Sequence, residues 1–330
     1  MTEKVKLGIW GAGVWASLSA RSILDTGNFE IAVCHDSNEE NRRVFANEIE
    51  CIEASSEEEL LEHPGLHAVA IYTPNFLHAD HAIRSFERGL HVFVEKPMAN
   101  TVEESHRMLE ASNRTGRVLF VGHNTRRENR FRHIKSLLEN EALGKPVVPN
   151  MTFTSPAGLK KELGGWRYDK NLCPALALSQ IGVHAIDVLH FLFGWSRETQ
   201  AWIRRVGLEL DVEDVCLGRM EHLGGMSSTL TTAYSVPRVR SIQILGTKGQ
   251  VESTLETEIS LQVLGSDHEE RIQLESVNTV LEEYREFAAC CRGERKPETG
   301  GEAGFMAVAV MEAMIRSSLE SKTVPVPRIE

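Results

Sequence analysis

The sequence predicts an α/β protein in which a doubly wound parallel sheet is followed by an α+β domain with a mainly antiparallel, open sheet. Through residues 5–121, short and nearly continuous apolar runs alternate with helical patterns, which is typical of a parallel sheet buried on both faces. After about residue 122 the strand-like runs become longer, and turn signals such as residues 246–249 separate them. The length of 330 residues is about twice that of a typical domain, so two domains are favoured over one.

The first half of the chain is expected to form strands and helices in alternation. The predicted strands cover residues 5–10, 31–34, 68–72, 91–94 and 118–121. Between them, helical patterns begin at Val14, after Ser37, at His78 and at Thr101. This alternation indicates repeated βαβ units, and it assigns residues 1–122 to the first domain.

In the second half of the chain the regular alternation of predicted strands and helices ends. A basic helix is predicted at residues 129–140, a long apolar helix at 178–193, and strands at 149–154, 201–206, 226–234, 241–244 and 259–263. Helical patterns at 279–292 and 301–319 close the chain. We therefore expect residues 123–330 to form a second domain, with a C-terminal segment that could return to pack on the first.

Composition restricts the classes of partner. The 47 acidic and 36 basic residues give a net charge of −11, which disfavours binding to nucleic acid or to an anionic membrane. Six cysteines are scattered without a CxxC motif, as expected for reduced thiols in a cytoplasmic protein. We expect no secretory signal and no membrane span, because the first residues run into a strand and no apolar stretch reaches about 20 residues. A small molecule is the expected partner.

The first predicted strand leads directly into a glycine motif that can hold a dinucleotide. Gly11 and Gly13 form the start of G-x-G-x-x-A, in which Gly11 takes the tight turn and Gly13 lets the backbone approach a pyrophosphate. Ala16 keeps the helix close to the strand, and the helix N-terminal N–H groups face the anion. We count Val14 and Trp15, which open this helix, among the cofactor-binding residues. A plain strand-to-helix turn is the alternative interpretation.

Asp36 strengthens the dinucleotide interpretation. It lies 25 residues after Gly11, at the end of the second strand, where a carboxylate can accept hydrogen bonds from ribose hydroxyls. Its charge would repel a 2′-phosphate, so NAD is expected rather than NADP. Arg42 and Arg43 on the next helix could instead favour NADP, but pairing with Glu39 and Glu40 on a solvated face explains them better.

Further motifs give the chain a resemblance to a known family. Thr73-Pro-Asn75, His78 and Glu95-Lys96-Pro97 follow one another in the order seen in the Gfo/Idh/MocA family, the group of glucose-fructose oxidoreductase and inositol dehydrogenase. The resemblance continues to the end of the chain, through 122–127, 144–146, 166–167, 182–187, 246–249 and 301–304.

The resemblance implies a Rossmann domain, an open-sheet C-terminal domain that often mediates oligomers, and hydride transfer between a nicotinamide and a sugar-like alcohol or ketone. It implies a homodimer or homotetramer, and it adds Thr73, Pro74, Asn75, His78 and Glu95 to the cofactor-binding residues. The lysine of this motif lies beside the nicotinamide in the family, so Lys96 is the expected group that polarises the reacting oxygen. The bond from Lys96 to Pro97 could be cis, as in some relatives.

The long apolar helix carries three polar residues on one face. Gln180, His184 and Asp187 stand at positions i, i+4 and i+7, and the family order makes His184 the expected acid/base group. Gln180 departs from the inositol dehydrogenase branch, which has an aspartate four residues before the histidine. A glutamine can bind a hydroxyl but cannot take up a proton. Residues 173–176 also replace a glycine-rich stretch of the family, so a different pocket shape is expected.

Other residues complete the expected substrate site. With Gln180, we expect Trp166, Arg167, His123 and Arg126 to contact the substrate. A metal site at His184, Asp187 and His190 is a weaker interpretation, because no cysteine or glutamate completes a ligand set; we expect no metal.

Three functions fit these motifs. The first is an NAD-dependent oxidoreductase acting on a sugar, a polyol or a related compound. The second is a glycosidase that oxidises its sugar transiently, and the third is a non-catalytic, NAD(P)-sensing regulator of the same fold.

Overall fold

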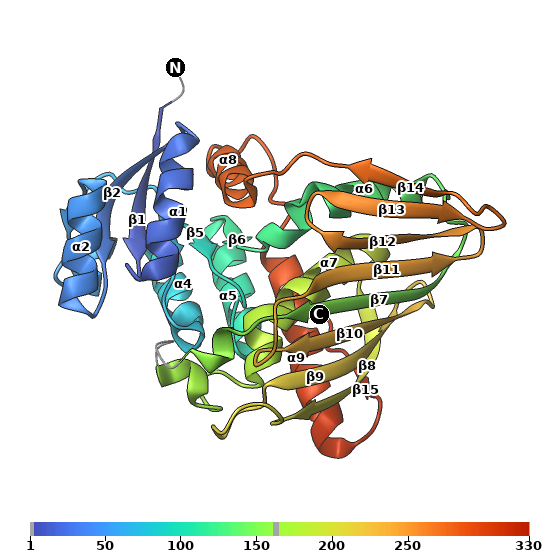
Figure 1. Ribbon diagram of the computed structural model, residues 1–330. Helices are drawn as coiled ribbons and strands as arrows, with labels where there is room; N and C mark the ends of the chain where they lie inside the picture. The colour runs from blue at the N-terminus through green and yellow to red at the C-terminus, as the bar shows by residue number, and fades with distance from the viewer. Residues whose placement is uncertain (1–2, 161–164, 330) are drawn as a thin grey trace. The chain divides into compact units, whose positions relative to one another are not determined.

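The computed structural model describes residues 3–160 and 165–329 (Figure 1). The chain folds into two compact units. The first comprises Met1–Asn124 and Asn278–Phe305, and the second comprises Thr125–Val277 and Met306–Glu330. The first unit therefore contains a segment from late in the sequence as well as the N-terminal part.

The first unit is built on a six-stranded parallel sheet. Its strands are β1 (Val5–Trp10), β2 (Phe29–His35), β3 (Ile52–Glu53), β4 (Ala68–Ile71), β5 (His91–Val94) and β6 (Leu119–Val121), in the order β3-β2-β1-β4-β5-β6. This is the doubly wound order, and the strand order reverses between β1 and β4. The crevice beyond the carboxyl ends of these two strands is the place where such sheets bind ligands.

Helices α1 (Val14–Asp25), α2 (Glu39–Ile49), α3 (Glu57–Leu61), α4 (His78–Glu87) and α5 (Val102–Thr115) connect the strands of this sheet. Asn38, Ser56 and Thr101 cap the starts of α2, α3 and α5 with their side chains, as expected for short polar residues at these positions. Helix α1 differs, because Gly13 precedes it and offers no side-chain cap. The N–H groups of its first turn are therefore left for another partner.

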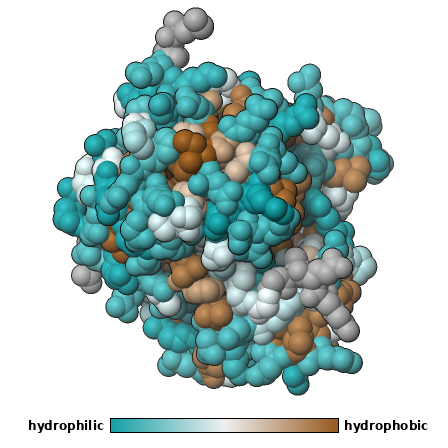
Figure 2. All heavy atoms as spheres, turned by 90° about the vertical axis from the view of Figure 1, so that its left-hand side faces the viewer, coloured by the Kyte–Doolittle hydropathy of each residue, from teal (hydrophilic) through white to brown (hydrophobic). Residues whose placement is uncertain are grey.

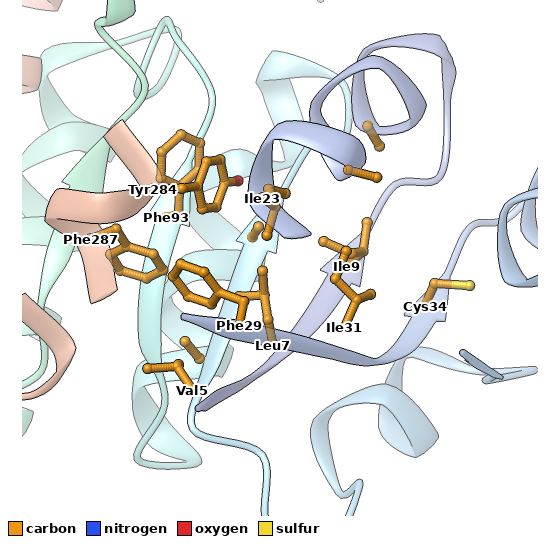
Figure 3. Close-up of a cluster of buried hydrophobic side chains, with 14 of the residues drawn as sticks. Val5, Leu7, Ile9, Ile23, Phe29, Ile31, Cys34, Phe93, Tyr284 and Phe287 are labelled. Atoms are coloured by element: carbon orange, nitrogen blue, oxygen red, sulfur yellow. The ribbon is translucent and has the colours of Figure 1, made fainter. Parts of the chain in front are cut away.

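Helix α8 (Thr279–Cys291), which follows the second sheet in sequence, supplies part of the first unit's core. Figure 3 shows Tyr284 and Phe287 of α8 lying against Phe29 of β2 and Phe93 of β5. The Phe93 and Tyr284 ring centroids are 4.5 Å apart and those of Phe29 and Phe287 are 6.0 Å apart. Such aromatic contacts add about 0.5–1.5 kcal/mol each beyond the burial of their area.

The second unit is built on a nine-stranded sheet in the order β14-β13-β12-β11-β7-β10-β9-β8-β15. Its strands are β7 (Pro146–Thr154), β8 (Ser196–Arg204), β9 (Val215–His222), β10 (Ser227–Ala233), β11 (Arg240–Gly246), β12 (Gly249–Leu255), β13 (Glu258–Val263), β14 (Glu269–Gln273) and β15 (Val324–Pro325). Only β7 and β10 pair in parallel among these described strands. The predicted fold class is confirmed in both units.

Helices cover one face of this sheet. Alongside α6 (Asn129–Glu139) and α7 (Val183–Phe193), residues of α9 (Gly301–Glu320) contact it: Ser317 Oγ accepts from the N–H of Ala201, and Ser318 Oγ accepts from that of Ile203. On the other face Trp202 and Leu217 are cross-strand partners, and their side chains are 43% and 46% exposed. The sheet is therefore open on one side.

The predicted helix at 178–193 is divided in the structure. Residues Leu178–Gly182 form a π-helical turn, and the α-helix α7 starts only at Val183. Before the turn, Ala175 has a left-handed backbone with φ of 50°, and its carbonyl accepts from the N–H groups of both Leu178 and Ser179. A π turn holds one more residue than an α turn and changes the direction in which its side chains point. The simple i, i+4, i+7 pattern therefore does not describe Gln180.

Figure 2 shows one face of the molecule on which hydrophilic residues predominate and hydrophobic residues form small patches. No helix within the described residues is both long and apolar enough to cross a membrane.

Candidate active site

A cradle for an anion lies between β1 and α1. Gly11 has a left-handed φ of 93°, and a Cβ atom there would stand 2.8 Å from the backbone N of Thr73 and the backbone C of Tyr72. A Cβ atom at Gly13 would meet nothing within 4 Å, so space is open beside the helix start. The first turn of α1 contains no acidic residue. The loop therefore presents uncapped N–H groups to open space, an arrangement suited to a pyrophosphate.

The two glycines provide a matched pair of variants. We expect Gly11→Ala to lower the free energy of unfolding by about 2–4 kcal/mol, because it combines backbone strain with a backbone clash. Gly13→Ala should cost less than about 1 kcal/mol but should weaken cofactor binding, since its methyl group fills the cradle. Urea denaturation and cofactor titration of both variants would check this. Equal stability of the two variants would contradict the assignment of separate roles.

Asp36 anchors the cradle from the end of β2. Its Oδ2 accepts from the N–H of Ala12 and its Oδ1 from the N–H of Asn38, both at 2.8 Å. Each carboxylate oxygen can accept a further hydrogen bond, so ribose hydroxyls can still be bound. Arg42 donates to the carbonyl of Asp36 at 3.1 Å and to Glu53 at 2.8 Å.

The two arginines considered for an NADP phosphate are thus held by acids. Arg43 pairs with Glu40, as the sequence suggested. Arg42 pairs with Glu53 of β3 and not with Glu39 or Glu40, because β3 lies next to β2 in the sheet.

The loop after β4 is fixed by two histidines. The ring nitrogens of His78 lie 2.9 Å from the carbonyl oxygens of Pro97 and Thr73, and the side chain is 1% exposed. Burial lowers the pKa of His78 to about 4, although both carbonyls favour the charged ring. Thr73 Oγ1 lies 3.0 Å from Nδ1 of His81. His78 therefore links the loop at Thr73 to the turn after Lys96.

Asn75 has a buried amide group. It is 5% exposed, and within the described residues its Nδ2 has no hydrogen-bond partner. A buried unpaired amide costs about 1–3 kcal/mol, so a ligand that accepts a hydrogen bond there would recover this energy. Together with the cradle and Asp36, this group fits a nicotinamide dinucleotide.

Glu95 and Lys96 close β5 at the same edge of the sheet. Trp15 Nε1 donates to Glu95 Oε1 at 2.8 Å, and the backbone N–H of Lys96 donates to Glu95 Oε2 at 3.3 Å. Burial raises the pKa of the Glu95 carboxyl, and the neighbouring Lys96 ammonium works against this rise. The peptide bond between Lys96 and Pro97 is cis. The Lys96 ammonium is therefore close enough to act on the Glu95 carboxyl, whose charged form is disfavoured by burial.

In the second unit, His184 is held by a threonine. Nδ1 of His184 lies 3.0 Å from Oγ1 of Thr125, and the imidazole is half-buried in α7. A hydroxyl that accepts from Nδ1–H would leave the lone pair on Nε2, and that nitrogen could then receive a substrate proton.

Asp187 and His190 have different partners. Arg126 donates through Nε to Asp187 Oδ2 at 2.8 Å and through Nη2 to Oδ1, in a buried pair, and its guanidinium lies over the Phe191 ring. His190 Nε2 lies 3.2 Å from Ser196 Oγ. Among residues 3–160 and 165–329, no group of three or more potential ligand side chains could hold a metal ion.

Gln180 contacts an arginine and a cysteine. Its Oε1 accepts from Arg167 Nε at 3.2 Å, and its Nε2 donates to Cys173 Sγ at 3.3 Å. The Arg167 guanidinium stands 4.3 Å from the centroid of the Trp166 ring. Trp166 packs against the hydrophobic cluster that contains Cys173.

Two family models match the chain. The model for the Gfo/Idh/MocA oxidoreductase family, NAD-binding Rossmann fold, matches residues 5–123, and the model for the Gfo/Idh/MocA C-terminal domain matches residues 131–252. The chain belongs to the Gfo/Idh/MocA family. It is therefore an oxidoreductase of a family of NAD(P)-dependent sugar and polyol dehydrogenases, and the predicted resemblance is confirmed.

Individual relatives are distant but similar over their whole length. D-xylose 1-dehydrogenase (NADP+) of Haloarcula marismortui is 25% identical, with 97% of this chain and 92% of that protein covered. Myo-inositol 2-dehydrogenase of Thermotoga maritima is 23% identical, with 98% and 99% covered. The structure of levoglucosan dehydrogenase in complex with NADH matches with a TM-score of 0.91 at 21% identity over 99% of this chain and 100% of that one. At 21% identity, the similarity to levoglucosan dehydrogenase is a similarity of fold.

In this Gfo/Idh/MocA protein, most predicted residues of the first unit lie at one edge of its sheet. They follow β1, β2, β4 and β5 and comprise Gly11, Gly13, Val14, Trp15, Asp36, Thr73, Pro74, Asn75, Glu95 and Lys96. Val14 and Trp15 are 80% and 45% exposed there. His78 lies below this edge and contacts protein carbonyls, and His123 is fully buried after β6, so direct ligand contacts by these two residues remain predictions.

In the second unit, the structure places predicted residues in three hydrogen-bonded pairs, one of which includes an unpredicted partner. These are Arg167 with Gln180, Thr125 with His184, and Arg126 with Asp187. Sequence reasoning missed Thr125 and Cys173. Thr125 lies in the stretch 122–127 that carries part of the family resemblance, and that position was the available signal. Cys173 gave no signal beyond the departure from the family's glycines.

Proposed function

We propose that this protein is a dehydrogenase that oxidises a carbinol of a sugar, polyol or related compound, or reduces the matching ketone. A bound nicotinamide supplies the hydride chemistry. The observation that carries the proposal is the shared edge of one sheet, at which an anion cradle follows β1, Asp36 follows β2 and Lys96 follows β5. The cradle N–H groups hold the pyrophosphate, and Asp36 accepts from the ribose hydroxyls.

Lys96 and His184 divide the acid/base work in this proposal. The Lys96 ammonium donates a hydrogen bond to the reacting oxygen and stabilises its negative charge as the C–H bond breaks. Nε2 of His184 accepts the hydroxyl proton in oxidation and returns it in reduction. In this proposal the Thr125 hydroxyl accepts from Nδ1–H, which leaves the lone pair on Nε2.

For the cofactor, we infer a preference for NAD over NADP. Asp36 carries a negative charge where a 2′-phosphate would lie, and Arg42 and Arg43 are paired with Glu53 and Glu40. The named cofactor of the xylose dehydrogenase relative, NADP+, is the argument against this inference.

Asp36→Ser should reduce the ratio of NADH to NADPH affinity by about 10–100-fold, because it removes a charged acceptor and its repulsion of phosphate. The ratio is the right quantity, since the lost bonds to Ala12 and Asn38 affect both cofactors equally. Fluorescence titration of both reduced cofactors would measure it. An unchanged ratio would contradict the assigned role of Asp36.

A screen of polyols and aldoses with the preferred oxidised cofactor tests the function itself. Absorbance at the wavelength of the reduced nicotinamide should rise with at least one substrate. Release of aglycone from glycosides without net reduction would favour the redox glycosidase. Tight cofactor binding without either reaction would favour the regulator, and absence of cofactor binding would contradict all three.

We also infer self-association through the open face of the second sheet. Trp202 and Leu217 expose their side chains side by side there, and a depression of about 540 Å³ adjoins them. Exposed apolar patches of this kind favour protein contacts. Light scattering should give the mass of a dimer or tetramer, and a monomer at micromolar concentration would contradict the inference.

A further inference from the structure

Arg167 is a cation without an acidic partner near the proposed base. It is half-buried, yet no carboxylate of the described residues lies within ion-pair distance of its guanidinium. Arg126, which contacts the same stretch of helix, is fully paired with Asp187. Partial burial of an unpaired guanidinium is costly in free energy, so we expect a bound anion to pair with Arg167.

The contacts of Arg167 leave its binding end available. Its Nε donates to Gln180 Oε1, and its face lies on the Trp166 ring 4.3 Å away. Nη1 and Nη2 make no hydrogen bond to any residue in the described ranges. A guanidinium held on its Nε side and stacked on a ring presents a planar pair of donors, which matches the two oxygens of a carboxylate.

Gln180 offers no negative charge to balance this cation. Its amide oxygen already accepts from Arg167, and its amide nitrogen donates to Cys173 Sγ. Both bonds fix the orientation of the carboxamide with its oxygen toward the guanidinium. The charge of Arg167 also acts on Tyr234. Burial raises the pKa of the Tyr234 phenol, and the positive charge of Arg167 works against that rise. The charge of Arg167 therefore acts on the Tyr234 phenol and is not neutralised by Gln180.

We propose that the substrate carries a carboxylate, as a sugar acid does, and that Arg167 binds this group through Nη1 and Nη2. The proposal rests on the proposed dehydrogenase function. Gln180 lies in the π turn that leads directly into α7, the helix of His184, so the proposal places the carboxylate beside the same helical segment as the proposed base. A single guanidinium matches one negative charge, which favours a carboxylate over a phosphate.

Matched substrate pairs test the proposal. We expect kcat/KM for D-glucuronate and D-galacturonate to exceed that for D-glucose and D-galactose by about 10–100-fold. Arg167→Gln should bring this ratio close to one, and Gln180→Glu should do the same by supplying an internal counter-ion for Arg167. Arg205→Gln removes an exposed guanidinium of the same unit and should keep the ratio. An equal preference in the unchanged protein, or a preference for glucose 6-phosphate, would overturn the proposal.

A binding measurement separates this proposal from the proposed function. Equilibrium dialysis of labelled D-glucuronate against the protein with saturating NADH should show binding that weakens at least tenfold in Arg167→Gln. Such binding without any hydride transfer would support the carboxylate site and contradict the dehydrogenase function. If neutral sugars turned over but Arg167→Gln bound D-glucuronate as the unchanged protein does, the dehydrogenase function would be supported and the carboxylate site contradicted.

Discussion

Replacing Lys96 by methionine should lower kcat by about 10³-fold, while the affinity for NADH should change by only a few-fold. Methionine keeps most of the side-chain length but has no N–H donor and no charge. Loss of one group that stabilises a developing oxyanion typically costs about 10²–10³, and loss of a proton-transfer partner costs a similar factor. Single-turnover kinetics with the best substrate of the screen would measure the effect.

Variants of Glu95 and Lys296 serve as comparisons for Lys96→Met. Glu95→Gln keeps an oxygen for Trp15 Nε1 but removes the charge next to the ammonium, so we expect a loss of about tenfold or less. Lys296→Met removes an exposed lysine of the same unit and should behave like the unchanged protein. If Lys96→Met kept its kcat but lost NADH binding, Lys96 would be a cofactor anchor and not the polarising group.

The first unit could be predicted closely because its strands are buried on both faces. β1 and β5 occupy the predicted residues 5–10 and 91–94, since an uninterrupted apolar run has few alternative explanations. In the second unit β9 was missed, because Gly218 interrupts its apolar pattern on the face covered by α9 and charged residues interrupt it on the open face. The edge strand β14 (Glu269–Gln273) was also missed, since it is largely exposed and charged, as edge strands often are.

The predictability of the site follows the same logic. The cradle, Asp36 and Lys96 were predicted because each lies at a strand end, where local sequence determines position. The partner of His184 lies 59 residues away in sequence, and no periodicity reports such a contact. The π turn at Gln180 was not predictable either, because it depends on the left-handed backbone of Ala175, a residue that seldom adopts this conformation.

His184→Asn should lower kcat by about 10²–10³-fold, the range typical of a lost general acid or base. Asparagine keeps a polar group of similar reach but cannot exchange a proton near neutral pH. In the direction of alcohol oxidation, the unchanged protein should gain activity as the histidine loses its proton, so the acidic limb of the pH–rate profile should flatten in the variant. An unaltered acidic limb would assign the proton to another group.

Thr125 tests whether His184 must be oriented as well as present. Thr125→Val has nearly the same shape but no hydroxyl, so Nδ1 loses this partner and either tautomer of the ring becomes available. We expect kcat to fall about tenfold with little change in KM, and Thr125→Ser to restore most of the activity. A purely structural role would lower the stability of Thr125→Val and leave its pH–rate profile like that of the unchanged protein. A displaced acidic limb that Thr125→Ser returns to its original position would instead identify Thr125 as a positioning residue for the proton-transferring imidazole.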